Sequence, residues 1–127
     1  LDGDLLNDDN AYMTNAGIPF YDAAGTGTAT LLRSGYTVLD SVEVENITVL
    51  PLYIQLFDAA AAADVILGTT VPTVTRMVPA GAGTPHNTSR LIDIRQRFGL
   101  GLVYAVTTTR NGSTAPATAA PLNFNYE

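Results

Sequence analysis

Hydrophobic residues are most concentrated in residues 52–58, and this segment predicts a buried central strand. Its sequence, LYIQLFD, is rich in aromatic and aliphatic residues and has neither Gly nor Pro inside it. Alternate residues of a strand point to opposite faces, and here both faces carry apolar groups. That pattern is typical of a sheet that is covered on both sides. We therefore expect the rest of the chain to pack around this strand.

Residues 36–45 alternate in character, which predicts a half-buried strand. One expected face is apolar apart from Asp40, and the other places Glu43 and Glu45 in water. The first face consists of Tyr36, Val38, Val42 and Val44, and the second of Thr37, Leu39, Ser41, Glu43 and Glu45. Residues 46–51 should form a turn or sharp bend before the central strand. A single long bent strand is the alternative.

Five further segments have the length and composition of short strands, and turn signals separate most of them. They are residues 28–33, 73–79, 90–97, 98–109 and 122–126.

Three of these segments carry additional information about their positions. Ile92 and Ile94 share one face of a segment with Arg at both ends, which is typical of an edge strand protected by charge. Residues 98–109 predict a second buried strand, and its glycines indicate a bulge or a close backbone approach. The last segment alternates most clearly, with Leu122, Phe124 and Tyr126 facing inward and polar residues facing outward.

One segment favours a helical turn instead. Five consecutive alanines follow Asp58, which we predict to be the N-cap, and Gly68 is the expected stop. The helix would have about three turns at most, so it depends on packing for its stability.

The first 27 residues lack a sustained period of either kind. We interpret residues 1–27 as an extended N-terminal arm that becomes ordered on a partner, with a short strand near residues 18–21. Residues 28–127 then form one domain. Short strands at near-regular spacing predict an all-β fold, either an antiparallel β-sandwich or a jelly-roll-like barrel.

Composition limits the partners that we expect. The chain is 46% hydrophobic and only 14% charged, where about 25% charged is usual. A low charge fraction without a membrane-length apolar run indicates surface that is buried against another protein, and no membrane partner. The net charge is -6 and every basic residue is Arg. This balance argues against nucleic acid as a partner, because phosphates require a clustered positive face.

Residues that could hold a metal or a nucleotide are few. There is no Cys, and His86 is the sole histidine, so the usual transition-metal ligands lack partners. Four arm carboxylates lack the spacing of a calcium loop, and we expect them to be solvated; they are Asp2, Asp4, Asp8 and Asp9. Residues 25–27 and 99–101 each have two glycines, where a nucleotide-binding loop has three. The second pair leads into a strand and not into the helix whose N-terminus would bind a phosphate. We therefore predict no metal and no cofactor.

Evidence for catalysis is equally weak. Serine catalysis would need a base, and no Ser lies in a Gly-x-Ser-x-Gly turn. Glu43 and Glu45 have a spacing that would suit glycoside hydrolysis, but any exposed strand face produces the same spacing. Three glycosylation-type triplets begin at Asn46, Asn87 and Asn111, a pattern that arises often by chance. We predict no catalytic residues and no enzyme activity.

The motifs that remain resemble those of small virion structural proteins of tailed bacteriophages, in particular capsid decoration (cement) proteins. The segments that carry the resemblance are LYIQLFDAA (residues 52–60), GTTVP (68–72), VPAG (78–81), FGLGL (98–102) and AVTTT (105–109). The likeness covers about residues 35–126 and excludes the arm. It implies a β-sandwich-like virion protein with no catalytic residues to carry over.

Together, these expectations describe a non-enzymatic decoration protein that binds and stabilises the outer surface of a phage head. Its partners would be the major capsid protein or other virion subunits and further copies of itself, a trimer being our guess. Ile18, Phe20 and Tyr21 of the arm would lie on a neighbouring subunit. The rivals are a carbohydrate- or receptor-binding module of a tail fibre and a tail or neck component. Ring candidates for a sugar site are Tyr36, Tyr53 and Tyr104, for which core packing is the better interpretation.

Overall fold

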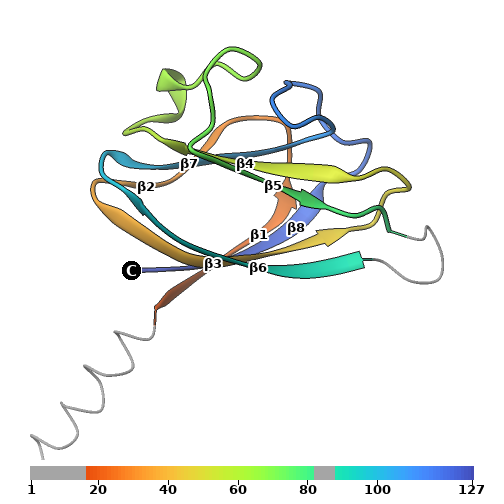
Figure 1. The fold of residues 1–127 in the computed structure, drawn as a ribbon, viewed down its shortest axis with the longest axis horizontal. Coiled ribbons are helices and arrows are strands. Elements are labelled where there is room, and N and C mark those ends of the chain that lie inside the picture. Colours follow the sequence, from red (N-terminus) through yellow and green to blue (C-terminus); the bar gives the residue numbers. More distant parts are fainter. Residues whose placement is uncertain (1–16, 82–87) are drawn as a thin grey trace, which may run out of the picture.

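The computed structural model describes residues 17–81 and 88–127, with the side chain of Thr88 left out, and shows eight strands and one short 3-10 turn (Figure 1). The 3-10 turn is Ala62–Asp64. The strands are β1 (Ile18–Gly25), β2 (Thr30–Ser34), β3 (Thr37–Asn46), β4 (Leu52–Asp58), β5 (Val74–Val78), β6 (Thr88–Phe98), β7 (Gly101–Thr107) and β8 (Ala120–Tyr126).

The strands form two four-stranded sheets that pack as a sandwich (Figure 1). Sheet A has the order β1-β8-β3-β6 and sheet B the order β2-β7-β4-β5, and every pairing is antiparallel. Consecutive strands lie in different sheets except for β4 and β5, and this order is that of an eight-stranded, double-sheet jelly roll. The predicted all-β sandwich is confirmed, and its sheets do not close into a barrel.

The core lies between the sheets, and β4 is buried on both of its faces as predicted. Leu52, Ile54 and Leu56 join the main core. On the other face, Phe57 packs with Ala59, Val65 and Val103 beneath the loop of residues 59–73. The loop of residues 108–119 covers the neighbouring part of this face, where Gln55 Nε2 donates to the carbonyl of Gly112. Figure 1 shows both loops over sheet B, in green and blue.

The predicted faces of β3 are correct for only part of the strand. Leu39 is fully buried, whereas Val38 is half-buried and Tyr36 is exposed. The register with both neighbouring strands shifts between Leu39 and Ser41. This β-bulge reverses the alternation, so the inward residues are Thr37 and Leu39 before it and Val42 and Val44 after it.

The alanine run does not form the predicted helix. Asp58 ends β4 instead of capping a helix, and Ala62–Asp64 is the sole helical turn in this stretch. The Asp58 carboxylate accepts hydrogen bonds from the backbone N–H groups of Gly99 and Leu100, at 3.2 and 2.7 Å. Packing of Ala59 and Val65 onto sheet B therefore overrides a helix that is too short to be stable by itself.

Residues 98–109 are divided between two strands. Phe98 ends β6 in sheet A, Gly99 and Leu100 form a turn, and β7 begins at Gly101 in sheet B. The expected close backbone approach is confirmed at Gly101, whose carbonyl accepts from the Ala59 N–H at 3.1 Å. The predicted edge strand of residues 90–97 is confirmed as part of β6 at one edge of sheet A.

The structure describes only part of the expected arm of residues 1–27. Residues 1–16 lie outside the described residues, whereas residues 18–25 form β1 and pair with β8. The predicted short strand at residues 18–21 is thus longer and belongs to the sandwich itself. Phe20 contacts Phe124 with ring centroids 6.1 Å apart. Edge pairing and this aromatic contact explain why the segment is ordered on its own domain.

Arg95 provides a stability test of the fold. Among the described residues it is the one non-glycine with a positive φ, 50°, and it lies where β6 places one more residue than β3 between Gln96 and Asp93. A side chain in this region costs about 1–2 kcal/mol. Arg95→Gly should therefore raise the free energy of unfolding by about 0.5–1 kcal/mol in urea denaturation. Arg97→Gly, at ordinary φ on the same strand, should lower it by a similar amount, and equal losses would contradict the assignment of strain.

Candidate functional site

The turn between β3 and β4 is held rigidly by one buried side chain. Asn46 is fully buried, and its Nδ2 donates to the carbonyls of Leu50 and Pro79 at 2.8 and 3.0 Å. Its Oδ1 accepts from the Thr48 N–H at 2.8 Å and from the Thr48 hydroxyl at 2.7 Å. Gly81 N–H also donates to the Thr48 carbonyl. These bonds fix the turn from inside and connect it to the chain that leaves β5.

This rigid turn presents two apolar side chains to solvent. Val49 is 72% exposed and Leu50 is 59% exposed. Large apolar groups on a fixed backbone lose little conformational entropy when they are buried against a partner. We refer to Val49 and Leu50 as the apolar tip.

Asn46 was also one of the three glycosylation-type triplets. Because its side-chain amide is buried and hydrogen-bonded, Asn46 is not accessible for attachment of a glycan. Asn111 is exposed in the turn after β7, and Asn87 lies outside the described residues.

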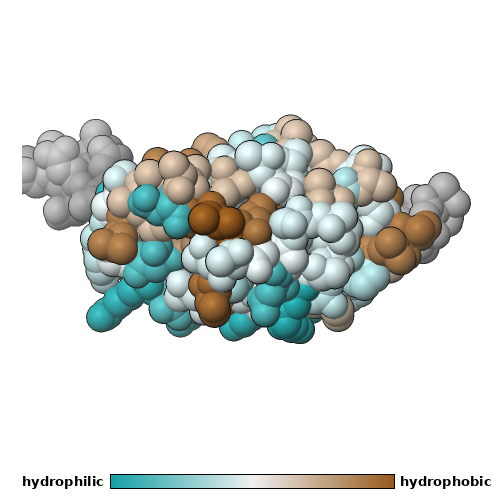
Figure 2. All heavy atoms as spheres, turned by 90° about the horizontal axis from the view of Figure 1, so that it is seen from above, coloured by the Kyte–Doolittle hydropathy of each residue, from teal (hydrophilic) through white to brown (hydrophobic). Residues whose placement is uncertain are grey.

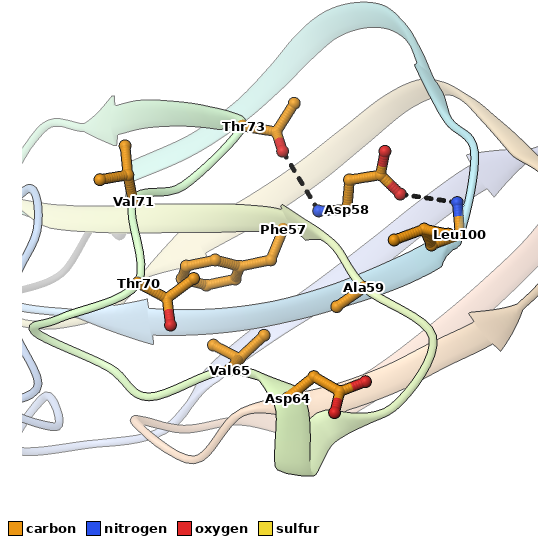
Figure 3. Close-up of a pocket in the computed structure, with 9 residues that line it drawn as sticks. All are labelled: Phe57, Asp58, Ala59, Asp64, Val65, Thr70, Val71, Thr73 and Leu100. Carbon is orange, nitrogen blue, oxygen red and sulfur yellow. Dashed lines mark hydrogen bonds between the residues drawn. The ribbon is translucent and has the colours of Figure 1, made fainter.

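A second feature is a pocket of about 270 Å³ beneath the loop of residues 59–73 (Figure 3). Phe57 and Val65 are buried along it, while Val71 and Leu100 are 83% and 61% exposed. The Thr73 hydroxyl accepts a hydrogen bond from the Asp58 N–H at 3.1 Å. The hydroxyls of Thr73 and Thr70 thus stabilise the loop, since Thr70 Oγ1 accepts from the Ile66 N–H at 2.9 Å, and Asp64 adds a carboxylate to a lining that is otherwise largely apolar. Figure 2 looks onto this loop-covered side and shows brown apolar areas separated by polar surface.

A third feature is a polar hollow of about 190 Å³ on the outer face of sheet A. It is lined by Tyr21, Glu43, Glu45, Ser89, Pro121 and Asn123. Glu43 and Glu45 lie on this outer face, as the strand pattern predicted. Tyr21 was expected in the arm, and no sequence pattern placed it beside these carboxylates.

The three residues predicted to contact a partner do not form one surface. Ile18 and Phe20 face the inner side of sheet A at the edge of the sandwich, since Phe20 is paired with the buried Phe124. Tyr21 points to the opposite side and is 60% exposed. Their role in partner binding stays a prediction.

The tyrosines expected to pack in the core differ from one another. Tyr104 is buried, and its hydroxyl donates to Asp22 Oδ2 at 2.6 Å. Burial, with this bond and the negative charge of Asp22, raises the pKa of Tyr104 above its ordinary value. Tyr53 is half-buried with the Arg110 guanidinium over its ring, at 5.4 Å from the centroid. Tyr36 is exposed, so the core prediction is wrong for this residue.

Other candidate groups do not gather into a site. His86 and the four arm carboxylates lie outside the described residues. Within residues 17–81 and 88–127, no three His, Asp or Glu side chains are placed to hold a metal ion. A hydrogen bond with Asp40 raises the pKa of the exposed Glu127 carboxyl.

Among the described residues, no helix is long and apolar enough to cross a membrane.

Comparisons with known proteins find little. No family model matches the chain, and no curated protein matches it. Among solved structures, the coat protein of Tobacco streak virus is similar over 87% of each chain, with 12% sequence identity and a TM-score of 0.32. A likeness at this level does not transfer a function.

Proposed function

We propose that this protein is a non-enzymatic structural protein of a virus particle, and specifically a decoration protein on the head of a tailed bacteriophage. It would bind as a small homo-oligomer to the outside of the capsid and stabilise the shell. Its partners would be the major capsid protein and neighbouring copies of itself.

The observation that carries the proposal is the apolar tip. A turn held by the Asn46 hydrogen bonds keeps Val49 and Leu50 in solvent, in a chain with only 14% charged residues. Burying such apolar side chains against a partner is favourable, and a backbone that is already fixed reduces the entropy cost of binding. The exposed Val71 and Leu100 at the loop pocket supply further apolar surface.

The fold supports the same interpretation by analogy. Double-sheet jelly rolls occur in viral capsid proteins and also in lectins, so the topology is compatible with a virion role without establishing it. The sequence motifs that resemble phage decoration proteins add support. In the structure they lie on β4, on β7 and in the loop between β4 and β5.

Mechanically, a decoration protein stabilises a shell by binding two of its subunits at once. A copy that covers the joint between two capsid subunits must lose both contacts before the joint can open. Several linked copies increase the effective concentration of each contact, so weak individual contacts still produce tight attachment.

The tip can be tested by replacing both of its residues. Val49→Ser with Leu50→Ser should reduce attachment to phage heads at least about tenfold, because burying a Val or Leu side chain is worth about 1.5–3 kcal/mol and about 1.4 kcal/mol is a factor of ten in affinity. The free energy of unfolding should change by less than about 0.5 kcal/mol for each exposed site. Co-sedimentation with DNA-filled heads measures attachment, and light scattering measures the mass of the free protein.

The matched control is Leu91→Ser, which removes an equally exposed leucine from the outer face of sheet A. This variant should attach as the parent protein does. A parent protein that ignores heads but sediments with isolated tails would replace the decoration role with a tail or neck role. If the double variant attached as well as the parent protein, the tip would not be part of the interface.

A further inference from the structure

We propose that the hollow on the outer face of sheet A binds one neutral pyranose unit of a polysaccharide. This binding site goes beyond the structural role proposed above and does not depend on attachment to a particle.

The pairing of three strands places the main groups of the hollow in one row. Tyr21 on β1 is paired with Asn123 on β8, and Asn123 is paired with Glu43 on β3. Neighbouring strands are about 4.8 Å apart, so the backbones of Tyr21 and Glu43 are about 10 Å apart with that of Asn123 between them. Glu45 and Ser89 are directly paired and add a carboxylate and a hydroxyl in the adjoining row.

The backbone explains why there is a hollow at this place. The register between β1 and β8 shifts between Asp22 and Gly25, directly after Tyr21. The residues inside this irregularity are Ala23 and Ala24, whose side chains are small. The resulting space of about 190 Å³ is smaller than the 300 Å³ or more of drug-sized sites, which matches one sugar ring and not a longer chain.

The side chains have the chemistry that a pyranose requires. The exposed Tyr21 ring offers an apolar face for the C–H side of a sugar. The Ser89 hydroxyl donates to Glu43 Oε2 at 3.3 Å, and Asn123 Nδ2 donates to Glu43 Oε1 at 3.5 Å. These bonds orient a carboxylate that can still accept from sugar hydroxyls, because each oxygen has two lone pairs.

Charge selects the class of sugar. Glu43 and Glu45 make the lining negative, so uronic acids and other acidic sugars are disfavoured by repulsion. Among the described residues, no three acidic or His side chains gather here to hold a calcium ion, and the Tyr21 ring has no role in such a site.

The test is an NMR titration of the ¹⁵N-labelled full chain with glucose, mannose and galactose, with galacturonate as the acidic comparison. At least one neutral sugar should shift the backbone amides of residues 21, 43 and 123, and galacturonate should not. Tyr21→Ala should weaken this binding about fivefold or more, as expected for the loss of a ring contact. Tyr36→Ala removes a similarly exposed tyrosine from outside the hollow and should leave the binding unchanged.

Two results would overturn the proposal. One is the absence of shifts with every neutral sugar at 50-fold excess over about 1 mM protein, where even weak binding is visible. The other is a salt-dependent shift of the same amides by an arginine-rich peptide in place of sugar, which would assign the hollow to a basic partner protein. The Val49→Ser and Leu50→Ser variant should retain sugar binding, so failure of the decoration role and failure of this site are separate outcomes.

Discussion

Replacing Leu102 with Asp is expected to unfold the isolated domain. Leu102 is fully buried in β7, an inner strand of sheet B, and belongs to the main core. An Asp there would place a carboxylate among apolar side chains and leave a void. Such a change costs more than about 4 kcal/mol, which approaches the total stability of a domain at the lower end of the usual range of about 5–15 kcal/mol. Loss of the near-ultraviolet circular dichroism spectrum and of the cooperative thermal transition would measure the effect.

Leu50→Asp is the matched control for this experiment. It makes the same chemical change at a side chain that is 59% exposed, so the thermal transition should stay within about 2–4 °C of the parent. A folded and cooperative Leu102→Asp variant would contradict the position of β7 in the core.

The strands with the simplest patterns were predictable from the sequence. In β8, Leu122 and Phe124 are buried and Asn123 is exposed, as the alternation indicated. In β4, apolar residues on both faces predicted a covered strand, and the structure places the core on one face and a loop on the other. Both predictions rest on regular side-chain alternation, which holds wherever a strand is uninterrupted.

The errors occur where the backbone departs from this regularity. The bulge after Leu39 reverses the faces of β3, and its cause is pairing with β6 and β8 at distant sequence positions. The alanine run has high helix propensity, but Asp58 instead accepts two backbone hydrogen bonds from the turn at residues 99–100. A single segment does not contain the information about such long-range partners.

The candidate sites were less predictable for the same reason. The apolar tip depends on Asn46, which joins a turn to Pro79 more than thirty residues away. The hollow on the outer face of sheet A combines Tyr21 with Asn123 and Glu43, three residues that only the sheet order brings together. The signal that was available for the tip was a pair of apolar residues, Val49 and Leu50, inside a predicted turn.

The second large effect is expected for Gly101→Ala. Gly101 has a φ of 150°, and a Cβ at this position would lie 2.6 Å from the carbonyl oxygen of Ala59 and 2.7 Å from that of Arg33. Both obstacles are backbone atoms, so the strands that begin and end here must separate to admit a methyl group. We expect the free energy of unfolding to fall by about 3 kcal/mol or more, measured by urea denaturation.

Gly99→Ala, two residues earlier in the same turn, separates this close approach from a general need for glycine. A Cβ at Gly99 would meet only Asp58 Oδ2, at 4.0 Å, and φ is not in the left-handed region. This change should leave stability within about 0.5 kcal/mol or raise it, because Ala restricts the unfolded chain. Equal losses at both glycines would mean that the turn requires flexibility, whereas a loss at Gly101 alone would assign the effect to the close approach of Gly101 to the backbone of Ala59 and Arg33.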